Sequence, residues 1–413
     1  MNNQHLTIRN LGPIKKCEID LTKMMVLDGL QAAGKSTIAK TIFFFRTIKN
    51  DIVDLILNPY IDNIKSEIPI QLHKKFIQMF GDDNAENLLV SFYYAKNVEV
   101  EIFSSSASVK VSDTVFQWIE GLKYFNFTLN DKPKLLNDIE KVFADNKDIV
   151  YIPAGRSMLS ILSEPLSHIF FNFDDAQKNM IDYCTSDYIN RVTKIKPAFK
   201  SYEKLFSREH TKNFGDLFFP LIQDKMGHIL QGKYSYMDGE EFLQLFGDNR
   251  KFIPIKFTSS GQQEVLWILN LIYYYLMKSK PTCFIIEEPE AHLYPDTQKE
   301  IAEYIALALS DKNECIITTH SPYILGTFSN LLDAFRLMSE GYNISGLLEQ
   351  EFLTSYQLLD SKEFSAYFVS RGELENAVDE ENGLIKNELI DGASDKINGF
   401  ADDLMYLERK GKI

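Results

Sequence analysis

The clearest chemical signature is Gly29-Leu-Gln-Ala-Ala-Gly-Lys-Ser36, which matches the phosphate-binding pattern GxxxxGK[ST]. In this pattern, the backbone N–H groups of the loop and the start of the following helix surround a polyphosphate. The Lys35 ammonium can reach the outer phosphates, which makes it a candidate catalytic residue, and the Ser36 hydroxyl can hold Mg²⁺. The sequence therefore predicts a site for ATP and Mg²⁺, with nucleotide contacts from Gly29, Gln31, Ala32, Ala33, Gly34, Lys35, Ser36 and Thr37.

Two adjacent carboxylates, Glu287 and Glu288, end the apolar segment 283–286. Burying such a pair at the end of a strand is costly unless a cation or a proton transfer uses it. We expect Glu287 to belong to the Mg²⁺ site, usually through water, and Glu288 to activate the attacking water. Taken alone, the pair also fits an exposed turn, and the phosphate-binding loop in the same chain favours the catalytic interpretation.

One histidine, His320, follows a third apolar segment within Thr318-Thr-His-Ser-Pro322. Nucleotide chemistry in open parallel sheets occurs at the carboxyl ends of the strands. We expect His320 at the same edge as the two carboxylates, where it can hydrogen-bond the γ-phosphate or the attacking water. A purely structural histidine is the alternative.

The segment Thr258-Ser-Ser-Gly-Gln-Gln263 precedes a long apolar helix, and Ser259 is suited to capping that helix. A serine and a glycine at the start of a helix can also bind an anion. The nucleotide-contacting residues predicted here are Ser259, Ser260, Gly261 and Gln262.

In chain order, GLQAAGKS, TSSGQQ, CFIIEEPEAHLYP and TTHSP resemble the P-loop, signature, Walker B with D-loop, and switch histidine of an ABC-type ATPase. More narrowly, EEPEAHLYP and TTHSP resemble the OLD-like (overcoming-lysogenization-defect) and AAA-type ATPases, many of which act in bacterial anti-phage systems such as PARIS and Septu. The segments NLGPIKKCEIDL and YIPAGRS are similar to the same group. The resemblance covers residues 1–50 and 250–335 directly and the rest of the chain loosely.

The resemblance implies that two subunits, in a homodimer or a larger homo-oligomer, hydrolyse ATP at their interface. Ser259 and Gly261 would then contact the γ-phosphate held by the other subunit. The chain departs from the family pattern in three places: Glu287 replaces the more usual aspartate, Ser260 stands where transporters have a glycine, and no glutamine can be assigned to a Q-loop. Arg156 is a candidate phosphate or relay residue, with structural ion pairing as the alternative.

Alternating strands and helices must position these residues. Apolar runs between turns predict the strands, and apolar residues at helical spacing predict the helices. The alternation favours an α/β P-loop NTPase of ABC-ATPase type, with a mainly parallel sheet covered on both faces. We expect the ATPase core at 1–50 and 250–335, a mixed insertion at 51–249 and a short helical tail at 336–413. The predicted strands are two within 6–21, then 24–27, strand-like 88–111, 149–152, 282–286 and 314–318; the predicted helices begin near 36, 71, 158, 260 and 295.

Composition limits the class of protein. The 413 residues are 45% hydrophobic and 25% charged, which is typical of globular domains. The longest apolar run, 265–277, is shorter than the roughly 20 residues of a membrane span, and the N-terminus does not resemble a signal peptide. We therefore expect a cytoplasmic protein without membrane contact. Four cysteines without metal-ligand spacing predict buried thiols: Cys17, Cys184, Cys283 and Cys315.

The net charge of −14 is unfavourable for covering nucleic-acid phosphates. The segment 191–212 departs from this balance, because bases and aromatic residues alternate along it. Such a pattern is compatible with a local DNA contact or with a solvated helix face above core aromatics. The bases are Arg191, Lys194, Lys196, Lys200, Lys204, Arg208 and Lys212, and the aromatics are Phe199, Tyr202, Phe206 and Phe214.

Two functions from different classes fit these observations. The first is an ATP-driven switch that controls a separate effector protein in anti-phage defence. Only residues 336–413 follow the core and they contain no DxD pair, so we do not expect the TOPRIM nuclease of full OLD-type enzymes. The second is a DNA-binding ATPase of repair or chromosome structure, which needs heptad arms or a strongly basic face. The charge favours the first, and the long insertion argues against a transporter ATPase.

Overall fold

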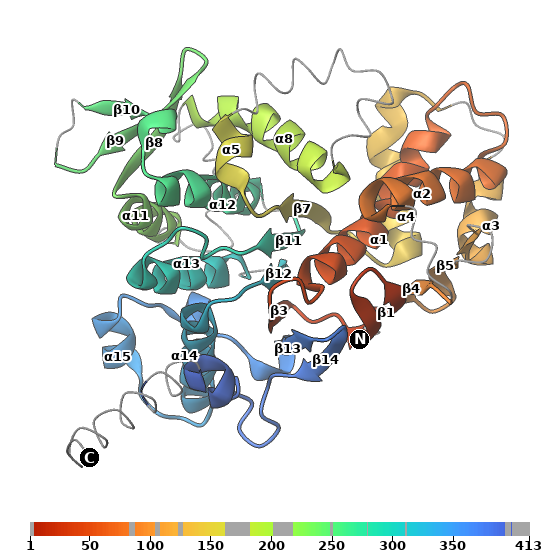
Figure 1. The fold of residues 1–413 in the computed structure, drawn as a ribbon. Coiled ribbons are helices and arrows are strands. Elements are labelled where there is room, and N and C mark those ends of the chain that lie inside the picture. Colours follow the sequence, from red (N-terminus) through yellow and green to blue (C-terminus); the bar gives the residue numbers. More distant parts are fainter. Residues whose placement is uncertain are drawn as a thin grey trace, which may run out of the picture.

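A six-stranded sheet forms the centre of the computed structural model (Figure 1), which describes residues 4–81, 87–103, 108–122, 127–161, 182–200, 218–247, 251–278, 280–309, 312–392 and 398. Four neighbouring strand pairs are parallel, and only the edge pair of β13 with β14 is antiparallel. The parallel strands therefore end at one common edge. The order across the sheet is β14 (Glu373–Asn376), β13 (Phe364–Ser370), β3 (Met24–Gly29), β12 (Glu314–Thr318), β11 (Thr282–Glu287) and β7 (Asp148–Ile152).

Both faces of this sheet are buried, because successive side chains along each strand point in opposite directions. On one face, Met24 and Val26 of β3 belong to a core shared with several helices. On the other face, Met25 and Leu27 belong to a core shared with helix α1 (Lys35–Ile56) and a second sheet. The predicted covered, mainly parallel sheet is confirmed. The helices of the first face are α8 (Tyr183–Ile195), α11 (Phe218–Leu230), α12 (Ser260–Lys278), α13 (Pro295–Ala308) and α14 (Pro322–Ser339).

The second sheet has five antiparallel strands in the order β2, β1, β4, β5, β6. Its β1–β2 hairpin confirms the two strands predicted within 6–21, and β4 to β6 extend the hairpin with strands from the predicted insertion. The strands are β1 (His5–Leu11), β2 (Ile14–Asp20), β4 (Leu89–Ala95), β5 (Val98–Phe103) and β6 (Ser108–Val111); helices α2 (Ile64–Phe80), α3 (Asp113–Gly121) and α4 (Lys132–Phe143) and the 3-10 turn η1 (Leu129–Asp131) accompany them.

A third, three-stranded antiparallel sheet follows α11 and was not predicted. It consists of β8 (Gly232–Met237), β9 (Glu240–Leu245) and β10 (Phe252–Pro254). The pair Asp238-Gly239 joins β8 to β9, and both residues have positive φ, 52° and 86°. Such a pair between apolar residues is a strong hairpin signal, so the sequence contained the information needed to predict this turn.

The C-terminal segment corrects the prediction of a helical tail. After α14, α15 (Ser345–Gln350) and two 3-10 turns, η4 (Ser355–Gln357) and η5 (Ser361–Glu363), the chain returns to the central sheet as β13. There β13 pairs in parallel with β3, from Phe364 opposite Met24 to Val369 opposite Gly29 (Figure 1). Because an unpaired β3 would expose a sheet edge, residues outside 1–50 and 250–335 are needed to complete the ATPase sheet. Strand β7, from the predicted insertion, completes its other side.

The described residues include no helix with the length and apolar character needed to cross a bilayer. All four cysteines are buried and carry free thiols, as predicted. Burial raises the pKa of the Cys17 thiol to about 12, so this thiol stays protonated and unreactive at neutral pH.

Candidate functional site

The phosphate-binding loop joins the end of β3 to the start of α1, as the sequence predicted. Both glycines of the loop have positive φ, 141° at Gly29 and 110° at Gly34. A Cβ on Gly34 would lie 2.3 Å from Cδ1 of Ile14, and a Cβ on Gly29 would lie 2.1 Å from the carbonyl oxygen of Val369. The loop can therefore keep its shape only with glycine at both positions.

Lys35, the first residue of α1, points back into this loop. Its Nζ donates hydrogen bonds to the carbonyl oxygens of Gly29, at 2.8 Å, and of Leu30, at 3.0 Å. Burial lowers the pKa of the Lys35 ammonium, and the negative charges of Asp28 and the nearby glutamates partly oppose that effect. Burial in turn raises the pKa of the Asp28 carboxyl. The loop thus holds an ammonium whose charge is poorly solvated, which favours replacement of its carbonyl partners by a phosphate.

Glu287 ends β11 and is buried, and its two carboxylate oxygens differ in their hydrogen bonding. Its Oε2 accepts a hydrogen bond from the backbone N–H of Ala154, at 3.2 Å. Its Oε1 is buried and accepts no hydrogen bond from the described residues. A buried carboxylate oxygen in that condition suits a cation. Ser36, the other predicted magnesium ligand, is exposed at the start of α1.

Glu288 lies where β11 leaves the sheet, in a positive-φ conformation of 42°. Its N–H donates to the carbonyl oxygen of Thr318 at 2.8 Å, which ties it to the end of β12. Its carboxylate Oε1 lies 3.7 Å from Nε2 of His320. The conformation therefore turns Glu288 out of the strand, away from the buried position of Glu287, and toward the predicted histidine.

His320 lies between this carboxylate and Lys35. Both ring nitrogens are close to Nζ of Lys35, Nδ1 at 3.3 Å and Nε2 at 3.1 Å. The ring nitrogen nearest the ammonium must act as acceptor. The structure therefore brings together the three residues predicted to be catalytic, from three loops at the carboxyl edge of the sheet.

Glu290 is a site residue that was not predicted. Its Oε1 accepts hydrogen bonds from the Thr319 hydroxyl, at 2.8 Å, and from the backbone N–H of His320, at 2.7 Å. Burial raises the pKa of the Glu290 carboxyl, and its Oε2 has no hydrogen-bond partner among the described residues. The only sequence signal for the contact between Glu290 and the His320 segment is a third carboxylate in the motif EEPE, two residues after Glu288.

The predicted signature residues cap α12. The Ser259 hydroxyl accepts from the Gln262 N–H at 3.3 Å, and Gln262 Oε1 accepts from the Ser259 N–H at 3.1 Å, which confirms the predicted cap. Ser259 and Ser260 are exposed. A Cβ on Gly261 would lie 2.9 Å from the carbonyl oxygen of His292, so this glycine allows α12 to approach the loop after β11. In the described part of the chain, no hydrogen bond of Ser259 or Gln262 reaches the phosphate-binding loop.

Arg156 begins the short helix α5 (Arg156–Ile161) and is fully buried. Its guanidinium donates to backbone carbonyls at the ends of β7 and β11 and in α12. Of the two roles considered for Arg156, these contacts support the structural one rather than a phosphate contact. Ala154, just after β7, donates a hydrogen bond to Glu287. Residues 153–157 contain no glutamine, so this segment offers no residue for a Q-loop.

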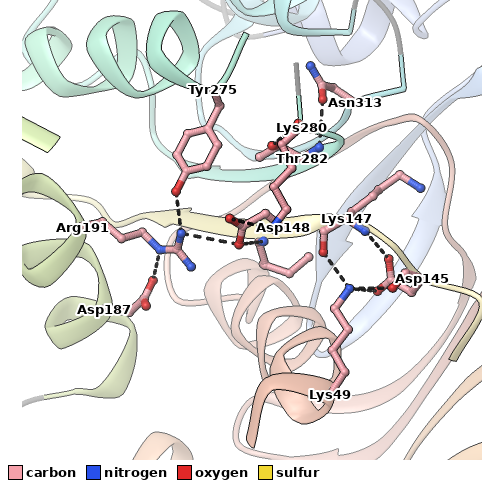
Figure 2. A network of polar contacts seen from close by, with 11 residues as sticks. Lys49, Asp145, Lys147, Asp148, Asp187, Arg191, Tyr275, Lys280, Thr282 and Asn313 are labelled. Carbon is pink, nitrogen blue, oxygen red and sulfur yellow. Dashed lines mark hydrogen bonds and ion pairs between the residues drawn. The ribbon is translucent and has the colours of Figure 1, made fainter. Parts of the chain in front are cut away.

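The predicted basic segment is largely structural where it is described. Figure 2 shows Arg191 between Asp187 and Tyr275, with Asp148 nearby; Arg191 lies 2.7 Å from Asp187 and 2.6 Å from the Tyr275 hydroxyl. Lys196 is buried and paired with Glu241, and Phe199 is a core residue. Asp148 and Thr282 begin β7 and β11, so this network lies at the edge of the sheet opposite the candidate site. Lys194 and Lys200 are exposed, and the remainder of the segment, 201–212, lies outside the described residues.

Comparison with known proteins identifies a family match that contains this site. The AAA ATPase domain family matches residues 1–325, a range that includes the phosphate-binding loop, both carboxylates and His320. No curated protein matches the chain.

Three solved structures of SMC head domains are similar at low sequence identity. An Smc head bound to the C-winged helix domain of ScpA is 12% identical to this chain. The alignment covers 78% of this chain and 90% of the Smc head chain, with a TM-score of 0.40. An Smc head with an extended coiled coil, bound to the C-terminal domain of ScpA derived from Pyrococcus furiosus, is 12% identical over 78% and 90%, with a TM-score of 0.36. The SMC head domain from Thermotoga maritima is 13% identical over 79% and 92%, with a TM-score of 0.35.

Proposed function

The chain belongs to the AAA ATPase domain family, and from that premise we propose that it is a Mg²⁺-dependent ATPase that works as a switch. Two subunits pair around ATP, separate after hydrolysis, and thereby control a separate effector protein. The observation that carries the proposal is the convergence of Lys35, Glu288 and His320, in which the His320 ring contacts Lys35 at 3.1 Å and faces Glu288 at 3.7 Å.

In this proposal the loop N–H groups and Lys35 bind the β- and γ-phosphates. Glu288 accepts a proton from the water that attacks the γ-phosphorus, because its carboxylate is half-exposed and is turned toward the phosphate-binding loop by the positive φ. His320 hydrogen-bonds the γ-phosphate or that water, and the Glu290 carboxylate fixes its backbone. Each residue then acts on atoms that lie next to the terminal phosphate.

Glu287 and Ser36 are the residues that would hold Mg²⁺. The buried Oε1 of Glu287 without a hydrogen bond is the observation that supports this fit. When bound, the ion supplies positive charge that balances the phosphate oxygens during phosphoryl transfer. The use of glutamate rather than aspartate at this position is compatible with a contact through water.

The subunit interface is proposed from the exposed features around the site. Ser259 and Ser260 present the start of α12 to solvent, where N–H groups can bind a phosphate of the other subunit's ATP. Large apolar side chains on the neighbouring loops are also exposed: Leu30 by 60%, Phe257 by 72% and Tyr294 by 73%. Exposed apolar residues around a polar site are typical of a surface that another subunit covers.

The role in anti-phage defence rests on the resemblance of EEPEAHLYP and TTHSP to defence ATPases. A DNA-binding ATPase is the alternative function. The ion pairs of Arg191 and Lys196 reduce its support, because these two bases are engaged within the fold. The exposed Lys194 and Lys200 are the described bases of the segment that remain available for a local DNA contact.

The test compares wild type with Lys35→Ala and Glu288→Gln, measuring ATP hydrolysis with Mg²⁺ and the molecular mass in solution by light scattering. We expect turnover to fall by about 100-fold or more in both variants. Glu288→Gln should also retain ATP and form a stable dimer, whereas Lys35→Ala should stay monomeric. Hydrolysis at the wild-type rate by Glu288→Gln would remove Glu288 from its role, and a monomer with ATP bound would contradict the switch. Proteins that co-purify with the trapped dimer are candidates for the effector.

A further inference from the structure

Arg156 connects three parts of the candidate site that are distant in sequence. Its Nη1 donates to the carbonyl oxygens of Pro153, at 2.9 Å, and Glu287, at 2.7 Å. Its Nη2 donates to the carbonyl oxygen of Glu288, at 2.9 Å, and its Nε donates to that of Glu264, at 2.9 Å. One buried guanidinium thus holds the backbone carbonyls of Glu287 and Glu288, at the end of β11, and that of Glu264 in α12.

The contact with α12 is reinforced through the side chain of Glu264. Its carboxylate Oε2 lies 3.5 Å from Nε of Arg156, and its Oε1 accepts the Ser157 hydroxyl at 2.6 Å. Glu264 is buried and lies one turn along α12 from Ser260. The helix that presents the signature residues is therefore attached to the end of β11 by charge-assisted hydrogen bonds, which are stronger and more directional than neutral ones.

The chemistry of this contact requires arginine. The planar guanidinium offers five donors in a fixed arrangement, whereas a lysine ammonium is a flexible point charge. Only the guanidinium can hold carbonyls from β7, β11 and α12 at fixed positions relative to one another. A shift of the first turn of α12 must therefore shift the peptide bonds of Glu287 and Glu288, or break these bonds.

We propose that Arg156 is a positioning residue that couples the first turn of α12 to the carboxylates at the end of β11. This inference rests on the proposed function, in which Ser259 to Gln262 meet ATP held by the other subunit. Binding there moves α12, and the guanidinium transmits the movement to Glu288 in the same subunit. Each active site is thereby completed only when its own signature residues are engaged.

The variant Arg156→Lys tests the coupling, and Arg46→Lys is its matched control. Arg46 is also fully buried and pairs with Glu314 at 2.5 Å, at the start of β12 and away from the candidate site. We expect Arg156→Lys to bind a fluorescent ATP analogue within about twofold of wild type while kcat falls by about tenfold or more. Arg46→Lys should keep the wild-type kcat below its unfolding temperature. An equal kcat in the two variants, or a parallel loss of affinity in Arg156→Lys, would overturn the proposal.

Amide hydrogen exchange without nucleotide tests the contact independently of ATPase activity. We expect Arg156→Lys to increase exchange in both 285–290 and 260–266, and Arg46→Lys to change neither segment. Unchanged exchange in those two segments would overturn the proposal even if kcat falls. If instead wild type does not hydrolyse ATP, the proposed function fails while exchange still decides whether Arg156 joins the two segments.

Glu264→Gln provides a second variant in case Arg156→Lys does not fold. It keeps the size of the side chain and leaves all the bonds from Arg156 to backbone carbonyls in place, including that of Glu264, but it removes the negative charge beside Nε of Arg156. The expected result is a loss of kcat smaller than that of Arg156→Lys, with retained nucleotide affinity. A wild-type kcat in Glu264→Gln would overturn the coupling through α12.

Discussion

The ammonium nitrogen of Lys35 lies 3.1 Å from Nε2 of His320, although 285 positions separate the two residues in the chain. Because an ammonium offers only donors, the ring nitrogen that it contacts must act as the acceptor. Both side chains are candidates for the γ-phosphate, so a bound nucleotide has to exchange this contact for phosphate contacts. The two side chains that are candidates for the γ-phosphate therefore contact each other.

His320→Ala should separate binding from turnover. We expect kcat to fall by about 100-fold, because the histidine acts on the transferred group, while ATP affinity changes little because Lys35 and the loop remain. His228→Ala is the control, since His228 is exposed and lies in α11. Steady-state hydrolysis and equilibrium binding are the measurements. A selective loss of affinity with unchanged kcat would contradict the assignment.

Glu290→Gln should change the pH dependence of stability. Burial raises the pKa of the Glu290 carboxyl above its ordinary value of 4.5, so the folded state binds more protons than the unfolded state between the two values. The stability that this residue contributes is therefore fully present below 4.5 and is lost as pH rises through the folded pKa. We expect the free energy of unfolding of Glu290→Gln, relative to wild type, to increase as pH rises from below 4.5 to neutrality. Urea unfolding across that range measures it.

A control for this titration is Glu18→Gln. The pKa of the exposed Glu18 carboxyl is lowered by its hydrogen bond from Arg9 and by Lys16. Its stabilising contribution is therefore present above the ordinary pKa and is lost as pH falls, so the difference from wild type should have the opposite sign of slope. Slopes of the same sign in the two variants would show that burial does not raise the pKa of the Glu290 carboxyl.

Gly29→Ala should destabilise the protein in the absence of any nucleotide. The new Cβ would lie 2.1 Å from the Val369 carbonyl oxygen, so β13 or the loop must move. We expect a loss of about 3 kcal/mol in the free energy of unfolding, from overpacking together with a disfavoured φ. Gly155→Ala is the matched control, because Gly155 has a φ of 66° but no atom within 4 Å of a Cβ. Equal losses in the two variants would mean that β13 does not constrain the loop.

Arg191→Ala should affect stability rather than DNA affinity. Removing the guanidinium leaves Asp148 and Asp187 with fewer partners, and we expect a loss of roughly 2 kcal/mol in the free energy of unfolding. Lys194→Ala, on the exposed side of α8, should stay within about 0.5 kcal/mol. Fluorescence anisotropy of duplex DNA against salt should give the same slope for both variants. A shallower slope for Arg191→Ala alone would restore this residue to a DNA contact.

The sequence was informative where chemistry and local pattern coincide. Strands β3, β11 and β12 are apolar runs that end in polar motifs, and their bounds agree with prediction to within about two residues. The convergence of Lys35, Glu288 and His320 followed from the rule that parallel strands share one carboxyl edge.

The missed features depend on contacts between residues that are distant in the chain. The place of strand β13 beside β3 is a long-range pairing that no local pattern encodes. The roles of Glu290 and Arg156 depend on backbone groups of other segments, which residue identity does not reveal. The β8–β9 hairpin is different, because the adjacent pair Asp238-Gly239 is a local sequence signal for its turn.

The pairing of β13 with β3 also sets an order of events during synthesis. The phosphate-binding loop is synthesised before β13, so the strand that leads into the loop gains its second neighbour only after residue 369 has been translated. A polypeptide that ends before β13 would leave one edge of β3 without a hydrogen-bonded neighbour. A finished C-terminal strand is therefore required before the strand that leads into the phosphate-binding loop has both of its neighbours.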